Sequence, residues 1–310
     1  MATPTSNLRE LVVTGATGKQ GGALIQALLA QPTPTFEIYA ITRNKSSPSA
    51  QRLLTSPNIH LIEGDFSNPT AIFSQIKNPW GLFSVTIPTN ATKEETQGKA
   101  MTTAALSAGI KHIIFTSTDR GGPEKSSKTP TSVPHFASKF HIEQDILQQT
   151  PQYNATYTFL RPVAFFENLS NDFLGRERFV ALWRRNHPSS QLQFISTRDI
   201  GLIAARAFLH HTFPQFQNRA LSLAGDSRTL SEAETIFQST TGTILPETYP
   251  FVAKLLQWLL HEQLGKMFDW FEQEGFGVDV EEVRKEFPFL KLKGFGGWLE
   301  GESAWRDEKK

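Results

Sequence analysis

Residues 11–22 read Leu11-Val12-Val13-Thr14-Gly15-Ala16-Thr17-Gly18-Lys19-Gln20-Gly21-Gly22, and this stretch decides the fold class of the 310-residue chain. A short β-branched run leads into glycines spaced G-x-x-G-x-x-G, and an apolar pattern of helical period follows over 23–29. Such glycines allow a sharp turn, a close approach to a pyrophosphate and tight packing of helix on strand, while the amides at the helix N-terminus face the phosphates. The alternative is a glycine turn without a ligand, which the flanking strand and helix disfavour. The candidate dinucleotide-binding residues are Gly15, Thr17, Gly18, Lys19, Gln20 and Gly21.

The end of the second expected strand, over 36–42, indicates which dinucleotide would bind. An NAD-preferring site usually ends this strand with Asp or Glu, which accepts hydrogen bonds from the ribose hydroxyls. Here Thr42-Arg43-Asn44-Lys45 follows, with no carboxylate. Arg43 suits a 2′-phosphate and Lys45 could add a second charge. The alternative is a solvated basic turn, and the sequence favours NADP(H) over NAD(H).

Strands and helices alternate through the first half of the chain, which predicts a doubly wound parallel sheet of the Rossmann type. The expected strands are 11–14, 36–42, 59–62, 81–86, 111–117 and 155–160, and the expected helices are 19–30, 69–77, 95–108 and 135–149. The segment 45–57 reads as a loop or a poor helix. Asp65 and Phe66 follow the third strand, at the edge where an adenine ring would lie.

The domain organisation expected from this pattern has two parts. A dinucleotide-binding domain over 8–160 is followed by a smaller, mostly helical lobe over 161–310, rich in aromatic residues from Trp258 to Phe276. Segments around 192–224 are expected to return to the main sheet. The polar loop over 121–134 is long, so we expect it to be mobile and close to the site.

Composition excludes several classes of function. The formal net charge of +1 gives no field for nucleic acid, and the absence of cysteine excludes disulfides, thiolate nucleophiles and Cys-ligated zinc. The eight histidines show no metal-ligand spacing, so no metal is expected. No apolar run approaches membrane-spanning length and no secretory signal is visible. The sequence therefore predicts a soluble, cytoplasmic protein.

Several further motifs carry a family resemblance over about residues 10–300. They are Thr42-Arg43-Asn44, His135-Phe136-Ala137-Ser138-Lys139, Leu160-Arg161-Pro162-Val163-Ala164-Phe165-Phe166-Glu167-Asn168-Leu169, Arg198-Asp199-Ile200-Gly201 and Met267-Phe268-Asp269-Trp270-Phe271-Glu272-Gln273-Glu274-Gly275-Phe276. Together with the glycine turn, they resemble the NmrA-like family, an atypical branch of the short-chain dehydrogenase/reductase superfamily. The resemblance implies a Rossmann domain, a smaller C-terminal lobe and NADP(H), with Lys139 on the ribose and nicotinamide side of the cofactor.

The candidate catalytic residues depart from the superfamily's usual pattern. Typical reductases of the superfamily use Tyr-x-x-x-Lys, in which Tyr donates a proton and Lys lowers its pKa. None of the four tyrosines of this chain has that spacing, and His135 occupies the Tyr position, one helical turn before Lys139. An imidazole can donate a proton near neutral pH, and Lys139 is expected to lower its pKa. The alternative is a histidine with no chemical role.

The remaining candidates would contact the substrate. Ser117 and Thr118 end the fifth strand, where the superfamily keeps its catalytic Ser, although strand ends often carry such residues. The expected substrate pocket is apolar with few polar groups. Sequence alone does not separate pocket from core for its candidates, which are Phe165, Phe166, Asn168 and Trp183.

Two functions remain open from the sequence. The first is an NADP(H)-dependent oxidoreductase for a small apolar or aromatic metabolite, or an isomerase or rearrangement enzyme in which the dinucleotide helps to form the site. The second is a non-catalytic NADP(H) sensor that acts through a protein partner, with access to the nucleus. The missing Tyr favours the sensor. The absence of a charge block, a disordered tail or a repeat for partner binding favours the enzyme.

Overall fold

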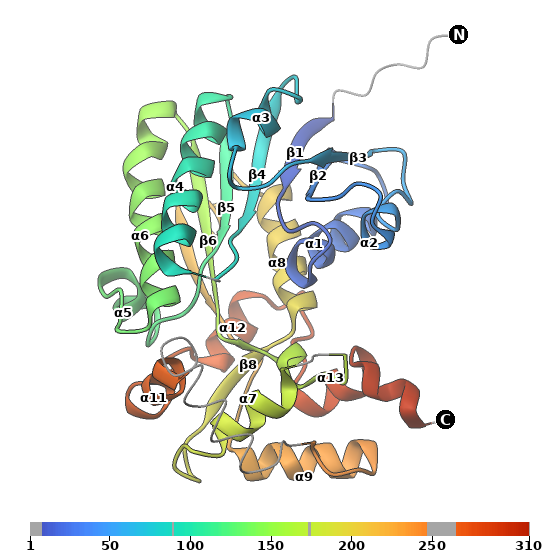
Figure 1. Ribbon diagram of the computed structural model, residues 1–310, viewed down its shortest axis with the longest axis vertical. Coiled ribbons are helices and arrows are strands. Elements are labelled where there is room, and N and C mark those ends of the chain that lie inside the picture. The colour runs from blue at the N-terminus through green and yellow to red at the C-terminus, as the bar shows by residue number, and fades with distance from the viewer. Residues whose placement is uncertain (1–7, 89, 173–174, 247–264, 310) are drawn as a thin grey trace. The chain divides into compact units, whose positions relative to one another are not determined.

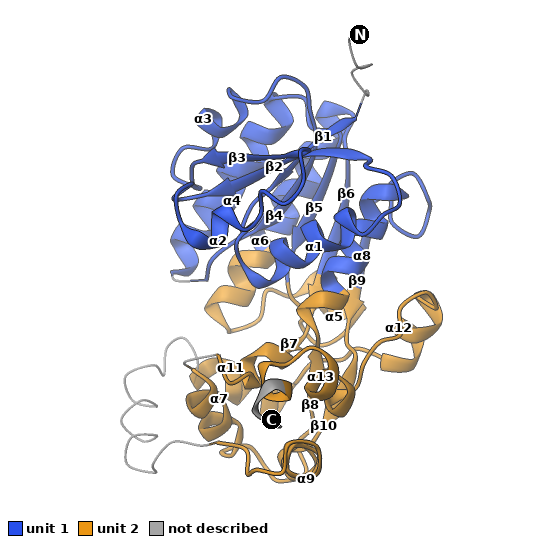
Figure 2. Cartoon of the chain, turned by 90° about the vertical axis from the view of Figure 1, so that its right-hand side faces the viewer, with its two compact units in different colours: residues 1–117, 141–160, 200–221 blue, residues 118–140, 161–199, 222–310 orange. Residues whose placement is uncertain are grey.

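The computed structural model describes residues 8–88, 90–172, 175–246 and 265–309. The chain divides into two compact units, coloured separately in Figure 2. Unit 1 comprises residues 1–117, 141–160 and 200–221, and unit 2 comprises residues 118–140, 161–199 and 222–310.

The main sheet has seven strands among the described residues. They are β1 (Arg9–Val13), β2 (Phe36–Thr42), β3 (Ile59–Glu63), β4 (Pro79–Val85), β5 (His112–Thr116), β6 (Thr156–Pro162) and β9 (Arg219–Leu223). Their order is β3-β2-β1-β4-β5-β6-β9, and β1 pairs in parallel with both β2 and β4. The strand order therefore reverses beside β1, which is where doubly wound folds bind their ligands. The predicted fold class is confirmed.

Helices cover both faces of this sheet (Figure 1). On one face lie α4 (Ala91–Ser107) and α6 (Pro134–Gln149), and on the other lie α1 (Lys19–Leu29) and α8 (Thr197–Leu209). The shorter elements are α2 (Pro48–Gln51), α3 (Pro69–Phe73) and the 3₁₀ turn η1 (Thr150–Tyr153). Apolar residues from the sheet and from α4 and α6 form one core, which includes Val12, Leu82, Met101, Phe115, Ile142 and Ile146.

Unit 2 contains a second sheet of three short strands, in the order β10-β8-β7. These are β7 (Ala164–Phe165), β8 (Leu192–Ile195) and β10 (Asp226–Arg228). The expectation that residues 192–195 return to the main sheet is therefore wrong, because β8 pairs with β7 and β10 instead. Of the expected segments, only α8 and β9 belong with the main sheet. Strands as short as β7 and β10 leave no periodic signal in the sequence.

The other described elements of unit 2 are helices, and its core is aromatic. The helices are α5 (Pro123–Lys128), α7 (Arg176–Trp183), α9 (Leu230–Thr241), α11 (Lys266–Gln273), α12 (Val280–Glu286) and α13 (Phe295–Gly301), with the 3₁₀ turns η2 (Phe166–Leu169) and η4 (Ala304–Lys309). We call the buried rings of this core the aromatic cluster: Phe136, Phe166, Phe179, Trp183, Phe194, Phe237, Phe268, Trp270, Phe271, Phe295, Trp298 and Trp305. Trp258 lies outside the described residues.

The two units are not separated by a single boundary after residue 160, because each unit is formed from three segments of the chain. Residues 118–140, with the expected loop over 121–134, group with unit 2, and part of this loop forms α5. Helix α6 therefore contributes its first half to unit 2 and its second half to unit 1. Phe136 belongs to the aromatic cluster, whereas Ile142 and Ile146 belong to the core under the main sheet.

Candidate functional site

The glycine turn after β1 has the geometry that the sequence predicts. The hydroxyl of Thr14 donates to the carbonyl of Phe83 (3.1 Å) and accepts from the amide of Val85 (2.9 Å), which fixes the end of β1 against β4. Gly15 then turns the chain with φ +58°, a conformation that favours glycine. A Cβ on Gly21 would lie 2.4 Å from the carbonyl oxygen of Gly15, so α1 packs against the turn as closely as the backbone permits.

The N-terminus of α1 fits a bound diphosphate. Its N-cap is Gly18, which provides no side chain to bind the first amides, and the first turn holds no acidic residue. Helix N-termini attract anions because their amides lack partners within the helix. Thr17 and Lys19 are exposed beside this terminus. Gln20 instead points to β5, where its side-chain oxygen accepts from the Thr116 hydroxyl at 2.9 Å.

The turn after β2 holds Arg43 at the rim of a depression in unit 1. The depression has a volume of about 310 Å³ and is lined by Arg43, Glu63, Gly64, Asp65, Ser67, Asn68, Ala71 and Ile72. Glu63 fixes the turn because its carboxylate accepts from the backbone amide of Lys45 at 3.0 Å. The structure therefore brings Arg43 and Asp65 together.

Asp65 carries a stabilised negative charge. Hydrogen bonds from the Ser67 hydroxyl and amide lower the pKa of its carboxyl, and the nearby charges of Lys93 and Arg43 lower it further. Sequence reasoning missed Glu63, Ser67 and Lys93. Lys93 lies in the first turn of α4, and no motif links it to the turn after β2. Phe66 packs partly against the core under the main sheet.

Ser117 and Thr118 follow β5 and are both buried. The amide of Ser117 donates to the carbonyl of Leu160 at 2.7 Å, which continues the pairing of β5 with β6. In unit 2, the Thr118 hydroxyl donates to the carbonyl of Pro162 at 3.3 Å. The backbone therefore fixes the position of each residue.

Asp119 organises the loop that follows, within unit 2. One carboxylate oxygen accepts from the amides of Gly121 (3.0 Å), Gly122 (2.9 Å) and Gly277 (3.2 Å). The other accepts from the hydroxyls of Ser126 (3.2 Å) and Ser222 (2.8 Å). Sequence reasoning assigned no such role to Asp119, because its partners are spread over more than a hundred residues of chain.

The candidate proton donor lies at the start of α6. His135 and Lys139 occupy the first half of this helix, in unit 2, and Lys139 is largely buried, with 9% of its surface exposed. The His135 ring lies 4.7 Å from the Phe136 ring, and the two are nearly perpendicular. Phe136 is fixed in the aromatic cluster, so it anchors this part of α6.

The candidate pocket residues fall into two groups. Phe166 is fully buried, and its ring stacks with Phe194 at 5.5 Å and with Trp298 at 5.6 Å. Trp183 is likewise buried in the aromatic cluster. Packing in the core accounts for both rings. Phe165 and Asn168 are only partly buried. A pocket role for these four residues remains a prediction.

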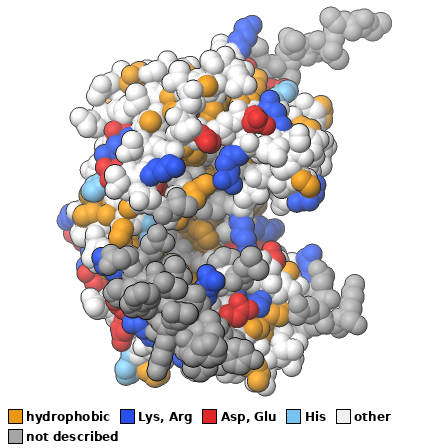
Figure 3. Space-filling view, viewed as in Figure 1, with side chains coloured by type: hydrophobic (Ala, Val, Ile, Leu, Met, Phe, Trp, Pro, Cys, Tyr) orange, Lys and Arg blue, Asp and Glu red, His pale blue; other side chains and the backbone are white. Residues whose placement is uncertain are grey.

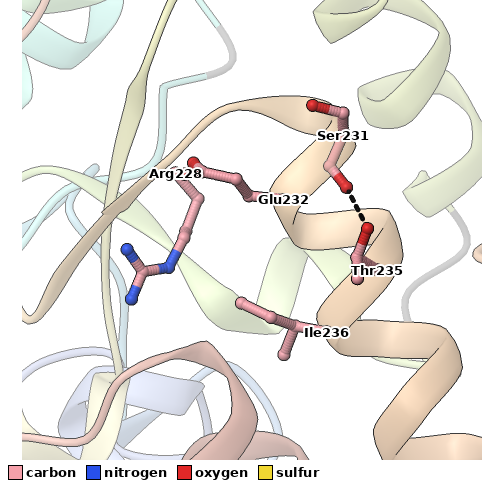
Figure 4. Close-up of a pocket in the computed structure, with 5 residues that line it drawn as sticks. All are labelled: Arg228, Ser231, Glu232, Thr235 and Ile236. Carbon is pink, nitrogen blue, oxygen red and sulfur yellow. Dashed lines mark hydrogen bonds between the residues drawn. The ribbon is translucent and has the colours of Figure 1, made fainter.

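Unit 2 also has a groove on α9, with a volume of about 320 Å³, which none of the predicted site residues lines (Figure 4). Its lining residues are Arg228, Ser231, Glu232, Thr235 and Ile236. Arg228 forms an ion pair with Asp226 at 2.9 Å, and Thr235 donates to the Ser231 carbonyl at 2.8 Å. Glu232 also forms a capping box with Thr229, and this capping box stabilises the start of α9.

The described residues show neither a group of side chains able to hold a metal ion nor a helix that is long and apolar enough to cross a membrane. In the view of Figure 3, acidic and basic side chains are interspersed over the described surface. No single-sign patch of the kind that binds nucleic acid is visible on this face.

Comparison with known proteins places these features in a wider group. A family model described as the NmrA-like family matches residues 8–298. A relative from Cladobotryum sp., the NmrA-like family domain-containing oxidoreductase FrzB, is 30% identical over 176 residues, 54% of this chain and 48% of the relative. Another, flvB from Aspergillus flavus, is 24% identical over 74% of this chain and 71% of the relative. The chain spans about half the length of the first curated relatives it matches.

Solved structures show the same fold at low identity. The Citrobacter sp. triphenylmethane reductase, complexed with NADP(H), has a TM-score of 0.71 and 20% identity, covering 94% of this chain and 99% of the reductase. The negative transcriptional regulator NmrA, in complex with NADP, has a TM-score of 0.71 and 18% identity over 98% of both chains. A reductase and a regulator therefore share this architecture.

Proposed function

The chain belongs to the NmrA-like family, and from this premise we propose that it binds NADP(H) and acts as an oxidoreductase on a small apolar or aromatic metabolite. The observation that carries the proposal is the close approach of Gly21 to Gly15 below an uncapped helix N-terminus. The names of two relatives support the activity, since FrzB and flvB are both called oxidoreductases. The complex of the triphenylmethane reductase with NADP(H) supports the cofactor.

Separate parts of unit 1 would hold the cofactor. The backbone amides of the turn from Gly15 to Gly21 and the exposed Thr17 and Lys19 would bind the diphosphate. Arg43, with Lys45, would bind the 2′-phosphate, because a guanidinium matches the phosphate oxygens with paired hydrogen bonds. Asp65 and Phe66 would contact the adenosine side. In unit 2, Lys139 would bind the ribose next to the nicotinamide.

The chain's own residues would transfer a proton and orient the substrate. NADPH supplies a hydride when it is bound. His135 would donate the proton that a carbonyl oxygen takes up, or would orient a water that does so, and Lys139 would favour release of that proton through its positive charge. The Ser117 hydroxyl would orient the substrate oxygen, and Thr118, Phe165 and Asn168 would contact the rest of the substrate. A non-redox isomerase or rearrangement enzyme would use the same residues without net hydride transfer.

A second candidate function is a non-catalytic sensor of NADP(H). Two observations favour it: the chain lacks Tyr-x-x-x-Lys, and the negative transcriptional regulator NmrA has the same fold. In that case Arg43 and the glycine turn would keep their roles, while His135 would have none. The sensor would act through a protein partner.

Turnover separates the two functions. The purified chain is titrated with NADPH and NADP⁺, and the absorbance of reduced nicotinamide is then followed with quinones, enones and aromatic aldehydes. We expect His135→Ala and Lys139→Ala to abolish turnover while the protein stays folded. The matched control is His141→Ala, because His141 lies further along α6 and contacts Glu95 at 2.8 Å in unit 1.

The outcomes differ clearly between the candidates. NADPH consumption that depends on His135 but not on His141 supports the enzyme. Tight NADPH binding with no consumption across the panel supports the sensor. If neither nucleotide binds, both functions are excluded.

A further inference from the structure

Trp270 of α11 lies deep in the aromatic cluster of unit 2, with 3% of its surface exposed. Its ring is 5.2 Å from the Phe136 ring, at an interplanar angle of 89°. It is 5.6 Å from the Phe276 ring and 5.8 Å from the Phe271 ring. Trp270 is thus enclosed by aromatic side chains.

The indole N–H of Trp270 is a buried donor for which the described part of the chain offers no acceptor. Buried donors in folded proteins almost always have a partner, because burial removes their hydrogen bonds to water. Trp305, in the same cluster, obeys this rule, since its indole N–H donates to the carbonyl of Leu169 at 2.9 Å. Phenylalanine would fill much of the same space without an unsatisfied donor. Packing alone therefore does not explain a tryptophan at position 270.

Phe136 links Trp270 to the candidate proton donor. The Phe136 ring lies 5.2 Å from the Trp270 ring and 4.7 Å from the His135 ring. All three residues belong to unit 2. A ligand bound against Trp270 and Phe136 would therefore contact a residue of the first turn of α6.

The Phe276 ring packs against Trp270 and is only partly buried. It lies between Gly275, which has φ +68°, and Gly277, whose amide donates to Asp119 at 3.2 Å. Asp119 therefore fixes the backbone just after Phe276. In the inference below, the Phe276 ring moves aside and the indole becomes accessible, while the backbone stays anchored at Gly277.

We infer that Trp270 is a specificity-determining residue of the proposed oxidoreductase: its indole N–H donates a hydrogen bond to a carbonyl or hydroxyl oxygen of an aromatic substrate. The ring of that substrate takes the place of the Phe276 side chain against Phe136 and Trp270. The inference rests on the proposed function, because it takes the ligand to be a substrate of the oxidoreductase. It concerns ligand binding, however, and is tested without turnover. A site built around an unpaired donor discriminates strongly against analogues that lack the acceptor oxygen.

The test compares two probes of similar shape, menadione and methylnaphthalene, of which only the first carries carbonyl oxygens. Their dissociation constants are measured by equilibrium dialysis in the presence of NADP⁺, so that no hydride is available to reduce the quinone. The variant is Trp270→Phe, which keeps an aromatic ring and removes the N–H. The matched control is Trp305→Phe, which removes an indole N–H that already has an acceptor within the chain. Thermal unfolding verifies that each variant is folded.

We expect Trp270→Phe to raise the dissociation constant of menadione about tenfold and that of methylnaphthalene less than about twofold. Trp305→Phe should change neither constant, although it should lower the unfolding temperature. Equal changes for both probes, no change for either, or no binding of menadione to the unsubstituted chain would each overturn the inference. Failure of the proposed function shows separately, as absence of NADP⁺ binding or of NADPH consumption, and leaves the difference between the probes intact.

Discussion

The glycine turn of unit 1 and the aromatic cluster of unit 2 obtain their geometry in different ways. In the turn, residues 15–21 are close in sequence, and the distance between their backbone atoms decides whether a position has room for a side chain. In the cluster, rings from segments as distant as Phe136 and Trp305 fill one core, and the volume of a side chain decides whether a substitution is tolerated. A local motif is therefore visible in the sequence, whereas a core assembled from distant segments is not. We therefore expect substitutions in the turn to act through backbone distances, and substitutions in the cluster to act through the volume of the side chains.

The largest effect is expected in the aromatic cluster. Phe166→Ala should lower the free energy of unfolding by about 3–5 kcal/mol, because it leaves a cavity among Phe194, Phe295 and Trp298. Chemical denaturation measures this loss. Affinity for NADPH should be unchanged in the protein that remains folded. Unchanged stability with lost substrate binding would instead make Phe166 a pocket residue.

The glycine turn should respond through its backbone. Gly21→Ala places a Cβ 2.4 Å from the Gly15 carbonyl oxygen, so the turn must open. We expect affinity for NADPH to fall about a hundredfold, or roughly 3 kcal/mol, by calorimetric titration. Gly22→Ala is the matched control, since a Cβ there meets the Ala16 carbonyl oxygen at an ordinary 3.5 Å. Equal losses for both variants would contradict this account of the turn.

A substitution at Arg43 tests the proposed 2′-phosphate site after β2, which is separate from the glycine turn. Arg43→Ala should weaken binding of NADPH by about 2 kcal/mol, because it removes charge-assisted hydrogen bonds to the 2′-phosphate. Binding of NADH should change little. Arg52→Ala serves as the control, since Arg52 is exposed just after α2 and does not line the depression that holds Arg43. Similar losses for NADPH and NADH would contradict the phosphate assignment.

The last effect depends on pH and concerns a charge in unit 2, at the start of α8. Burial raises the pKa of Asp199 from 3.8 to about 7, and the negative charge of Glu302 adds to the shift. The folded chain therefore keeps this proton between about pH 4 and pH 7 while the unfolded chain has lost it. It follows that the contribution of Asp199 to stability falls as the pH rises through this range.

Asp199→Asn should remove that pH dependence. We expect the variant and the unsubstituted chain to have similar stability below pH 4, and the variant to be more stable by at least about 1 kcal/mol at pH 8. Thermal unfolding at the two pH values measures the difference. A difference that is the same at both would show that the charge is not the cause.

Much of unit 1 could be predicted from the sequence. Most expected strands match β1 to β6 to within about two residues, and the glycine turn has the expected geometry. Helix propensity and apolar period act over a few neighbouring residues, so they remain visible in one sequence. The approach of Arg43 to Asp65 follows from the adjacency of β2 and β3. Lys93 carries no such signal, because its charge acts on Asp65 from a different element, α4.

The sequence by itself determined the Rossmann fold, the glycine turn and the position of His135 one helical turn before Lys139. Only the tertiary structure decided that β8 joins a separate sheet, that residues 118–140 group with unit 2, and that Trp270 is buried with a donor that has no acceptor among the described residues. The physical reason is the range of the interactions. A turn or a helix is fixed by neighbours in the chain, whereas strand partners and core contacts are chosen by burial summed over distant segments, which no local stretch of sequence contains.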